Sequence, residues 1–131
     1  MYDDLIGVPF ENGGRGPAAF DCWGLVMEVF RRHGVALPDY KIACTDASRI
    51  DSQISERRPL WEKVIGEPPV PSLVVIRFNS VVMCNHTGVY LGQGRFIHAR
   101  EKIGVNIDRI DSPAWNRRIE GFYVPGEGAL T

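Results

Sequence analysis

The apolar residues that follow Cys22 repeat with the period of an α-helix. They stand at the i+3, i+4, i+7 and i+8 positions of a helix that buries one face, namely Leu25, Val26, Val29 and Phe30. Asp21 is a residue type that favours the N-cap position, and Gly34 is typical of the residue just past a helix end. The sequence therefore predicts a helix over about residues 21–33.

From residue 73 onwards the apolar residues come in short runs rich in β-branched and aromatic side chains, which favour strands. There are runs at residues 73–78, 87–91, 95–99, 104–108 and 121–124. Gly92, Gln93 and Gly94 separate the second run from the third and predict a hairpin centred on Gly92 and Gln93. The pattern predicts an antiparallel sheet of about five strands between residues 73 and 124.

Between the predicted helix and the predicted sheet, the stretch around residues 47–65 is also predicted to be helical. Its apolar residues available for burial are Ile50, Ile54, Leu60, Trp61, Val64 and Ile65. Pro59 interrupts the pattern, so we expect two short helices rather than one. Helices followed by antiparallel strands predict an α+β fold with the N-terminal helices packed on the sheet. A chain of 131 residues fits a single domain over residues 1–131.

Composition and charge exclude several classes of function. A net charge of −1 gives no case for binding nucleic acid through bulk charge. No apolar run approaches the length of a membrane span, and the N-terminus lacks the basic region of a signal peptide. The three cysteines, at positions 22, 44 and 84, form no CxxC pattern, which favours free thiols in a reducing cytosol. If the protein acts outside the cell that makes it, we expect a route other than a signal peptide.

Cys22 is the first candidate for chemistry because it falls in the first turn of the predicted helix. Unpaired N–H groups and the helix dipole favour a thiolate there, and the thiolate is the reacting form of a nucleophilic cysteine. Asp21 would oppose this if its carboxylate faced the sulfur, so we expect it to point at backbone N–H groups of its own helix. The alternative is that Cys22 is a small buried apolar residue.

His86 and His98 lie on the two strands of the predicted hairpin. The expected pairing joins positions that sum to about 184 or 185, which makes the two histidines neighbours on one sheet. His98 then orients the imidazole of His86, and His86 takes the proton of the Cys22 thiol as a general base. Taken singly, each histidine is explained as a residue of the sheet whose hydrogen bonds are satisfied, with no chemical role. Together with the Asp-Cys helix start, they predict thiol acyl-transfer chemistry.

Four motifs resemble those of the NlpC/P60 superfamily of papain-like cell-wall cysteine peptidases. They are Gly-Val-Pro-Phe-Glu-Asn-Gly-Gly at 7–14, Asp-Cys-Trp-Gly-Leu at 21–25, His-Thr-Gly-Val-Tyr at 86–90 and Phe-Ile-His-Ala at 96–99. The resemblance spans residues 5–124 and implies a papain-like NlpC/P60 fold without a cofactor. It also implies that Cys22 is the nucleophile, His86 the base and His98 the third polar member. The implied substrate is an amide of a peptidoglycan stem peptide, with the γ-D-glutamyl–diamino-acid bond as the expected target.

The same resemblance places five further residues around the cleft and the oxyanion. They are Asp21, Trp23, Phe10, Gly13 and Gly14. Many family members carry tyrosine where this chain has Phe10, so we expect the oxyanion to rest on the backbone N–H of Cys22, with Tyr2 as the first alternative donor. Trp23 stands where serine is common in bacterial members, which predicts a bulkier wall beside the nucleophile.

A finer resemblance is to the tail-assembly and tail-tip peptidases of siphophages and gene-transfer agents. It rests on Asp-Cys-Trp-Gly-Leu-Val at 21–26, Leu-Pro-Asp-Tyr at 37–40 and the segment 109–123. It implies other tail-tip or hub proteins as partners, and a virion made in the host cytoplasm that acts in the periplasm or cell wall. The alternative is a catalytically weak or inactive structural component of the tail. A thiol acyltransferase or amidase is disfavoured, because permuted relatives of that kind place the histidine before the cysteine.

Other polar residues have simpler interpretations. Cys84, His86 and His98 offer three zinc ligands, but their spacing matches no standard zinc module, so we expect no metal. Cys44 is expected to be a bystander, and a cation at His33 suits the end of a helix. The remaining aromatic residues of interest, Trp61 and Trp115, are expected to be core or interface anchors.

Overall fold

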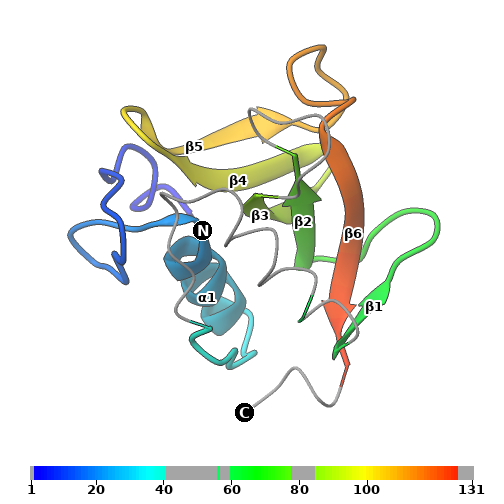
Figure 1. Cartoon of the computed structure of the whole chain (residues 1–131), viewed down its shortest axis with the longest axis horizontal. Helices are drawn as coiled ribbons and strands as arrows, with labels where there is room; N and C mark the ends of the chain where they lie inside the picture. The colour runs from blue at the N-terminus through cyan, green and yellow to red at the C-terminus, as the bar shows by residue number, and fades with distance from the viewer. Residues whose placement is uncertain (1, 41–55, 57–59, 78–84, 127–131) are drawn as a thin grey trace.

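The computed structural model of the chain describes residues 2–40, 56, 60–77 and 85–126. Within these residues lie the helix α1 (Cys22–Arg32) and the strands β1 (Trp61–Lys63), β2 (Ser72–Ile76), β3 (His86–Gly92), β4 (Arg95–Arg100), β5 (Gly104–Arg109) and β6 (Ile119–Pro125). Figure 1 shows α1 lying against the sheet, with β4 and β5 running across the direction of β2 and β6. This confirms the predicted α+β arrangement.

The strands form one sheet in the order β1-β6-β2-β3-β4-β5, and neighbouring strands are antiparallel. The central strands β2, β3 and β4 are almost wholly buried, because both faces of the sheet are covered. The five strands expected between residues 73 and 124 are present. The sheet therefore places His86, the first residue of β3, and His98, on β4, in adjacent strands.

The prediction for residues 47–65 was wrong at its C-terminal end. Residues 61–63 form strand β1 and pair with β6, and Ile65 is 97% exposed rather than buried. Trp61 explains the difference, because it is buried in edge contact with Trp23 and Phe30 while its strand pairs with β6, near the other end of the chain. Glu56 is helical, and the rest of the predicted stretch before Leu60 lies outside the described residues.

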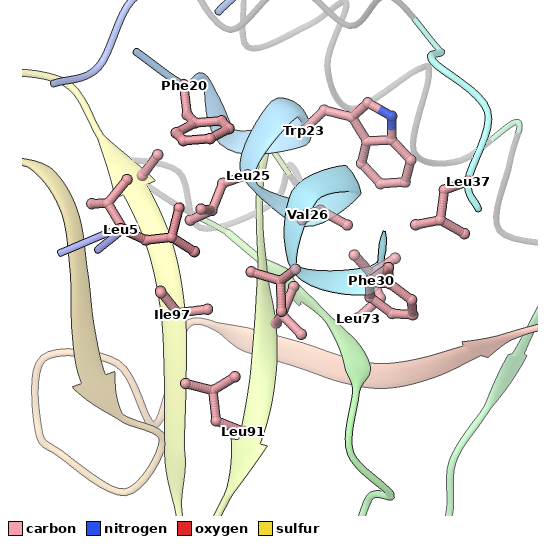
Figure 2. Close-up of a cluster of buried hydrophobic side chains, with 14 of the residues drawn as sticks. Leu5, Phe20, Trp23, Leu25, Val26, Phe30, Leu37, Leu73, Leu91 and Ile97 are labelled. Carbon is pink, nitrogen blue, oxygen red and sulfur yellow. The ribbon is translucent and has the colours of Figure 1, made fainter. Parts of the chain in front are cut away.

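Helix α1 begins and ends as the sequence predicts. The Asp21 side chain accepts a hydrogen bond from the backbone N–H of Gly24, and His33 is the C-cap. The apolar face of the helix is buried together with Leu37, Leu73, Leu91 and Ile97, as Figure 2 shows. These contacts join α1 to β3 and β4, and so hold the start of the helix in a fixed relation to the two strands that carry the histidines.

A smaller apolar cluster covers the other face of the sheet. It consists of Val74, Ile76, Tyr90, Phe96 and Trp115. Along β4, Phe96 belongs to this second cluster, whereas Ile97 and Ala99 belong to the cluster around α1, as strand alternation requires. His98 follows the same alternation and lies on the face that Trp115 covers, with ring centroids 4.8 Å apart.

The hairpin between β3 and β4 has a different register from the predicted one. Its turn is centred on Gln93 and Gly94, both with positive φ, and an irregularity lies between Tyr90 and Gly92. The pairs are Val89–Ile97, Tyr90–Phe96 and Gly92–Arg95. A two-residue turn with φ > 0 at both central positions matches the twist of a hairpin. His86 and His98 are therefore diagonal neighbours on one face rather than directly opposite.

In the described part of the chain, no helix combines the length and the apolar character that crossing a membrane requires.

Candidate active site

Cys22 and Asp21 are both buried at the start of α1, with exposed fractions of 3% and 0%. One carboxylate oxygen of Asp21 accepts from the Gly24 N–H at 2.7 Å and from Arg15 at 2.7 Å. The other accepts from the Gly13 N–H at 3.0 Å. Asp21 thus caps its own helix, as expected from the sequence, and its charge is compensated by Arg15 rather than left facing the sulfur.

The glycine-rich loop packs directly on the first turn of α1. Asp21 donates its N–H to the Gly14 carbonyl at 3.1 Å, and a Cβ atom on Gly24 would stand 2.0 Å from that carbonyl oxygen. A Cβ on Gly14 would in turn lie 2.8 Å from the Glu11 carbonyl oxygen. Gly14 in the loop and Gly24 in the helix therefore permit a close backbone approach at the residue before Cys22.

Arg15 also ties this loop to the segment that follows α1. Its guanidinium makes two hydrogen bonds of 2.9 Å to the two carboxylate oxygens of Asp39. Next to that pair, Trp23 donates its indole N–H to the Pro38 carbonyl at 3.1 Å, and its ring stacks on Tyr40. The start of α1 is thus held by the loop that precedes the helix and by the segment that follows it.

The two histidines of the sequence prediction are in contact. The His86 Nε2 and His98 Nδ1 atoms lie 2.9 Å apart, and the side chains are 5% and 0% exposed. Helix α1, which Cys22 begins, packs against β3, which His86 begins. The helix that begins at Cys22 and the hairpin that carries His86 and His98 therefore belong to one packed core.

Sequence reasoning missed Asp108. Its Oδ2 atom lies 2.7 Å from the Nε2 atom of His98 and also accepts a hydrogen bond of 2.8 Å from the Asn106 side chain. The described residues thus contain a continuous chain His86–His98–Asp108. Part of the signal was present in the sequence, because alternation along residues 104–108 puts Asn106 and Asp108 on one face. The pairing of Asn106 with His98, which brings that face to the histidines, is given by the structure.

Burial sets the charge state of both histidines. It lowers the pKa of His86 well below its usual 6.5, and repulsion from His98, when that ring is protonated, and from Arg100 acts in the same direction. Burial also lowers the pKa of His98, although the Asp108 hydrogen bond opposes the shift. The His98 hydrogen bond lowers the pKa of Asp108. At neutral pH the arrangement is therefore two neutral imidazoles and a carboxylate.

Gly88 makes the histidine contact possible. It lies between His86 and Tyr90 on the same face of β3, and a Cβ there would stand 2.8 Å from the Ile97 carbonyl oxygen and 3.1 Å from the His98 Cβ. Any larger residue would push β4 away from β3. The glycine of the His-Thr-Gly motif is therefore required by the close approach of His98.

The structure corrects two expectations for the cleft, namely Tyr2 as an alternative oxyanion donor and Trp23 as a wall. The hydroxyl of Tyr2 is hydrogen-bonded to the ring of His33, at the C-terminal end of α1. An eleven-residue helix is about 16 Å long, so Tyr2 is excluded as an oxyanion donor near Cys22. The Trp23 side chain is only 2% exposed and belongs to the core, so it forms no open wall of a cleft.

Phe10 lies beside the nucleophile segment. It forms a parallel bridge with Phe20, two residues before Cys22, and packs against the main core while remaining partly exposed. The bridge is completed by hydrogen bonds from the Glu11 N–H to the Phe20 carbonyl and from the Phe20 N–H to the Pro9 carbonyl. The backbone of Phe10 therefore lies next to the segment that leads into α1.

Other residues considered in the sequence are placed as follows. Trp61 and Trp115 are buried core residues, as predicted. Cys44 and Cys84 lie outside the described residues, so the zinc alternative is not addressed by the geometry. Among the residues that are described, no three His, Cys, Asp or Glu side chains gather in a way that could hold a metal ion.

Comparison with known proteins gives a consistent family match. The profile of the NlpC/P60 family matches residues 7–124. The "Probable endopeptidase p60" of Listeria welshimeri is 32% identical over 118 residues, which cover 89% of this chain and 20% of that protein. The "Gamma-DL-glutamyl hydrolase" of Bacillus subtilis (strain 168) is 32% identical over 137 residues, which cover 98% of this chain and 30% of that protein. The chain therefore spans a fifth to a third of the length of these two relatives.

The fold is shared with solved structures. A protein of the NLP/P60 family described as similar to lipoprotein, from Staphylococcus aureus subsp. aureus Mu50, superposes with a TM-score of 0.65 at 24% identity. The superposition covers 94% of this chain and 38% of that one. At this identity the likeness establishes the fold.

Proposed function

Because this chain belongs to the NlpC/P60 family, we propose that it is a cysteine peptidase that hydrolyses an amide bond in the peptide stems of peptidoglycan. The proposed target is the γ-D-glutamyl–diamino-acid bond, in keeping with a relative named gamma-DL-glutamyl hydrolase. The observation that carries the proposal is the buried His86–His98 contact, on a strand pair that packs against the helix begun by Cys22.

In the proposed first step, His86 takes the proton of the Cys22 thiol and the sulfur attacks the carbonyl carbon of the scissile amide. A neutral imidazole is needed for this, and the lowered pKa of His86 keeps it neutral at physiological pH. Negative charge develops on the carbonyl oxygen, and we assign its stabilisation to the backbone N–H of Cys22 at the positive end of α1.

In the second step the tetrahedral intermediate collapses. The C–N bond breaks, the protonated His86 gives its proton to the leaving amine, and the acyl group remains on the sulfur as a thioester. Water then attacks the thioester with His86 again as the base, which releases the acid and restores the thiol. His98 holds the His86 ring in position through both steps.

Digestion of purified sacculi tests the reaction. Wild-type protein, Cys22→Ala and a Cys44→Ala control are incubated with sacculi, and the muropeptides are identified by mass spectrometry. We expect cleavage by the wild type and by Cys44→Ala, and none by Cys22→Ala or by protein alkylated at Cys22 with iodoacetamide. Full cleavage by Cys22→Ala would show that the thiol mechanism is wrong.

We further propose that the peptidase works as part of a phage tail tip, in contact with other tail or hub proteins, and reaches the host periplasm and cell wall in the virion. The support is the tail-like sequence motifs, two of which contact each other. Trp23 of the Asp-Cys-Trp motif binds the Pro38 carbonyl and stacks on Tyr40, both within the Leu-Pro-Asp-Tyr motif. Mass spectrometry of purified tails tests the assignment, and absence of the chain from them would overturn it.

A structural role in the tail is the second candidate. It is favoured by Phe10, which cannot donate to an oxyanion, and by the burial of Cys22, which is only 3% exposed. This role predicts that particles carrying Cys22→Ala assemble and infect normally, whereas deletion of the gene abolishes tail formation. Electron microscopy and plaque counts on the two mutants separate it from a catalytic role.

A further inference from the structure

We infer that Asp108 is a positioning residue for the thiol chemistry, because its carboxylate fixes the tautomers of His98 and His86. It thereby determines that Nδ1 of His86 is the nitrogen that takes the thiol proton. The inference rests on the proposed function for the reaction itself, whereas the arrangement of protons in the histidine pair can be measured without a substrate.

The hydrogen bonds allow one arrangement of protons when both imidazoles are neutral. An ionised carboxylate only accepts, so the 2.7 Å contact with Asp108 requires a proton on Nε2 of His98. A neutral imidazole carries one N–H, so Nδ1 of His98 accepts. Across the 2.9 Å contact the donor must then be Nε2 of His86. The lone pair of the His86 ring is left on Nδ1.

Without the carboxylate, the opposite arrangement becomes allowed. His98 can then carry its proton on Nδ1 and donate it to Nε2 of His86. In that arrangement the His86 proton sits on Nδ1, and the ring cannot take a proton from Cys22 through that atom. Asp108 therefore selects between a competent and an incompetent form of the base, without itself touching the reacting atoms.

The surroundings hold the chain of hydrogen bonds in place. The ring of His98 is fully buried between the rings of Phe96 and Trp115, with centroid distances of 4.5 and 4.8 Å. Asn106 donates to the same Oδ2 atom that accepts from His98, which fixes the orientation of the Asp108 carboxylate. The partners of both ring nitrogens of His98 are therefore set by the fold.

Asp108 has a second effect during turnover. When the S–H bond of Cys22 breaks and the proton moves to Nδ1 of His86, a positive charge forms in a buried site. The carboxylate stabilises that charge through His98 until the proton passes to the leaving amine. The Asp108 side chain is 30% exposed, so solvent screens part of this attraction.

The test measures histidine tautomers and turnover on the same proteins. Long-range ¹H–¹⁵N spectra of histidine-labelled full-length protein distinguish N–H nitrogens from lone-pair nitrogens. We expect the wild type to carry its protons on Nε2 of both His86 and His98, and Asp108→Ala to populate Nδ1–H on His86. We expect kcat on a stem peptide to fall roughly tenfold to a thousandfold in Asp108→Ala, with little change in KM.

Asp111→Ala is the matched control, because it removes a carboxylate of the same type that is exposed and pairs with Arg109 at the surface. It should leave tautomers and kcat as in the wild type. Asp108→Leu fills a similar space without any acceptor and serves if the alanine variant does not fold, and we expect it to lower kcat at least tenfold. A folded variant at position 108 with wild-type tautomers, or with wild-type kcat, overturns the inference.

The two proposals fail in different ways. If the wild type cleaves no stem peptide but Asp108→Ala still redistributes the histidine protons, the proposed function is wrong and the positioning role is right. If the wild type cleaves and Asp108→Ala matches it in both measurements, the function is right and the role of Asp108 is wrong.

Discussion

Arg15 donates a hydrogen bond of 2.7 Å to the carboxylate of Asp21, which is completely buried one residue before the candidate nucleophile. A negative charge at that position would oppose formation of a thiolate on Cys22. The guanidinium compensates that charge and, through its paired contact with Asp39, also fixes the loop that follows α1. The loop before the helix thus contributes electrostatics as well as shape.

Replacing Arg15 should affect stability and thiol reactivity together. Arg15→Met leaves a buried carboxylate with its two backbone N–H partners but without a counter-charge. Because Arg15 is itself partly exposed and those hydrogen bonds remain, we expect a loss of about 1–3 kcal/mol in the free energy of unfolding. We also expect Cys22 of Arg15→Met to react with iodoacetamide more slowly than Cys22 of the wild type at pH 7. Peptide mapping measures the extent of alkylation at Cys22.

Arg31→Met is the control for that experiment. Arg31 is exposed and pairs with Glu28 on the surface of the same helix, so its removal should change the free energy of unfolding by less than about 1 kcal/mol. Equal alkylation rates in Arg15→Met and the wild type would show that the charge of Asp21 does not reach the sulfur.

Gly88→Ala should separate the two histidines without touching either ring. The added Cβ would meet the Ile97 carbonyl oxygen at 2.8 Å, which is backbone and can move only with β4. We expect kcat/KM to fall by at least tenfold and the His86–His98 hydrogen bond to be lost from the histidine NMR spectrum. Val89→Ala faces the other side of the sheet, so it should lower stability while preserving that hydrogen bond.

The stability of the fold should decrease between pH 6.5 and 5 because of the buried histidines. Since the pKa of His86 is lowered in the folded state, the unfolded chain binds more protons in this window, and the free energy of unfolding falls as the pH falls. Each such proton contributes up to about 1.4 kcal/mol per pH unit. Urea denaturation at several pH values measures the slope.

His86→Gln should flatten the pH dependence, because it removes the buried imidazole whose pKa is lowered in the folded state. An identical slope in the wild type and His86→Gln would mean that His86 is not buried in its neutral form.

Sequence patterns predicted the local elements of this fold well. The helix from Cys22, its N-cap and the hairpin strands all follow from periodicity and from residue types that act on near neighbours. Strand β1 was missed because it is only three residues long and exists through pairing with β6, near the other end of the chain. No local signal distinguishes such a segment from the end of a helix.

The candidate site was predicted only in part, again because one of its contacts depends on strand pairing. Cys22 and the histidines stood out because their residue types and motifs are rare, whereas Asp108 is one of sixteen acidic residues in the chain. Its partnership with His98 depends on the register between β4 and β5, in which His98 pairs with Asn106. Register is set by turn geometry and by packing across the sheet, so a sequence alone left it open.

Substitutions of His98 should separate orientation from charge. His98→Ala removes the acceptor for the His86 N–H, and we expect a loss of roughly tenfold to a thousandfold in kcat, against a nearly complete loss for His86→Ala. His98→Gln should recover much of the activity, since its amide can accept from His86 through oxygen and donate to Asp108 through nitrogen. Equal losses for alanine, asparagine and glutamine at this position would indicate a charged or metal-binding role instead.

Phe10→Tyr should raise turnover if the oxyanion lacks a side-chain donor. Phe10 is bridged to Phe20, two residues before Cys22, so a phenol at this position is carried by backbone that lies against the nucleophile segment. A well-aligned oxyanion hydrogen bond is worth up to roughly 2–4 kcal/mol in the transition state. A smaller gain is expected here, because the loop around Phe10 is packed for a side chain without a hydroxyl.

The measurement is kcat/KM on a defined stem peptide for wild type, Phe10→Tyr and Phe10→Leu, with Tyr2→Phe as a second control. Leucine at position 10 tests packing alone, and Tyr2→Phe should leave kcat/KM unchanged because the Tyr2 hydroxyl binds His33 at the opposite end of α1. If tyrosine and leucine at position 10 behave alike, Phe10 only fills space beside the nucleophile. The developing charge must then be held by backbone N–H groups at the start of α1, which is the arrangement that the buried cap of Asp21 keeps rigid.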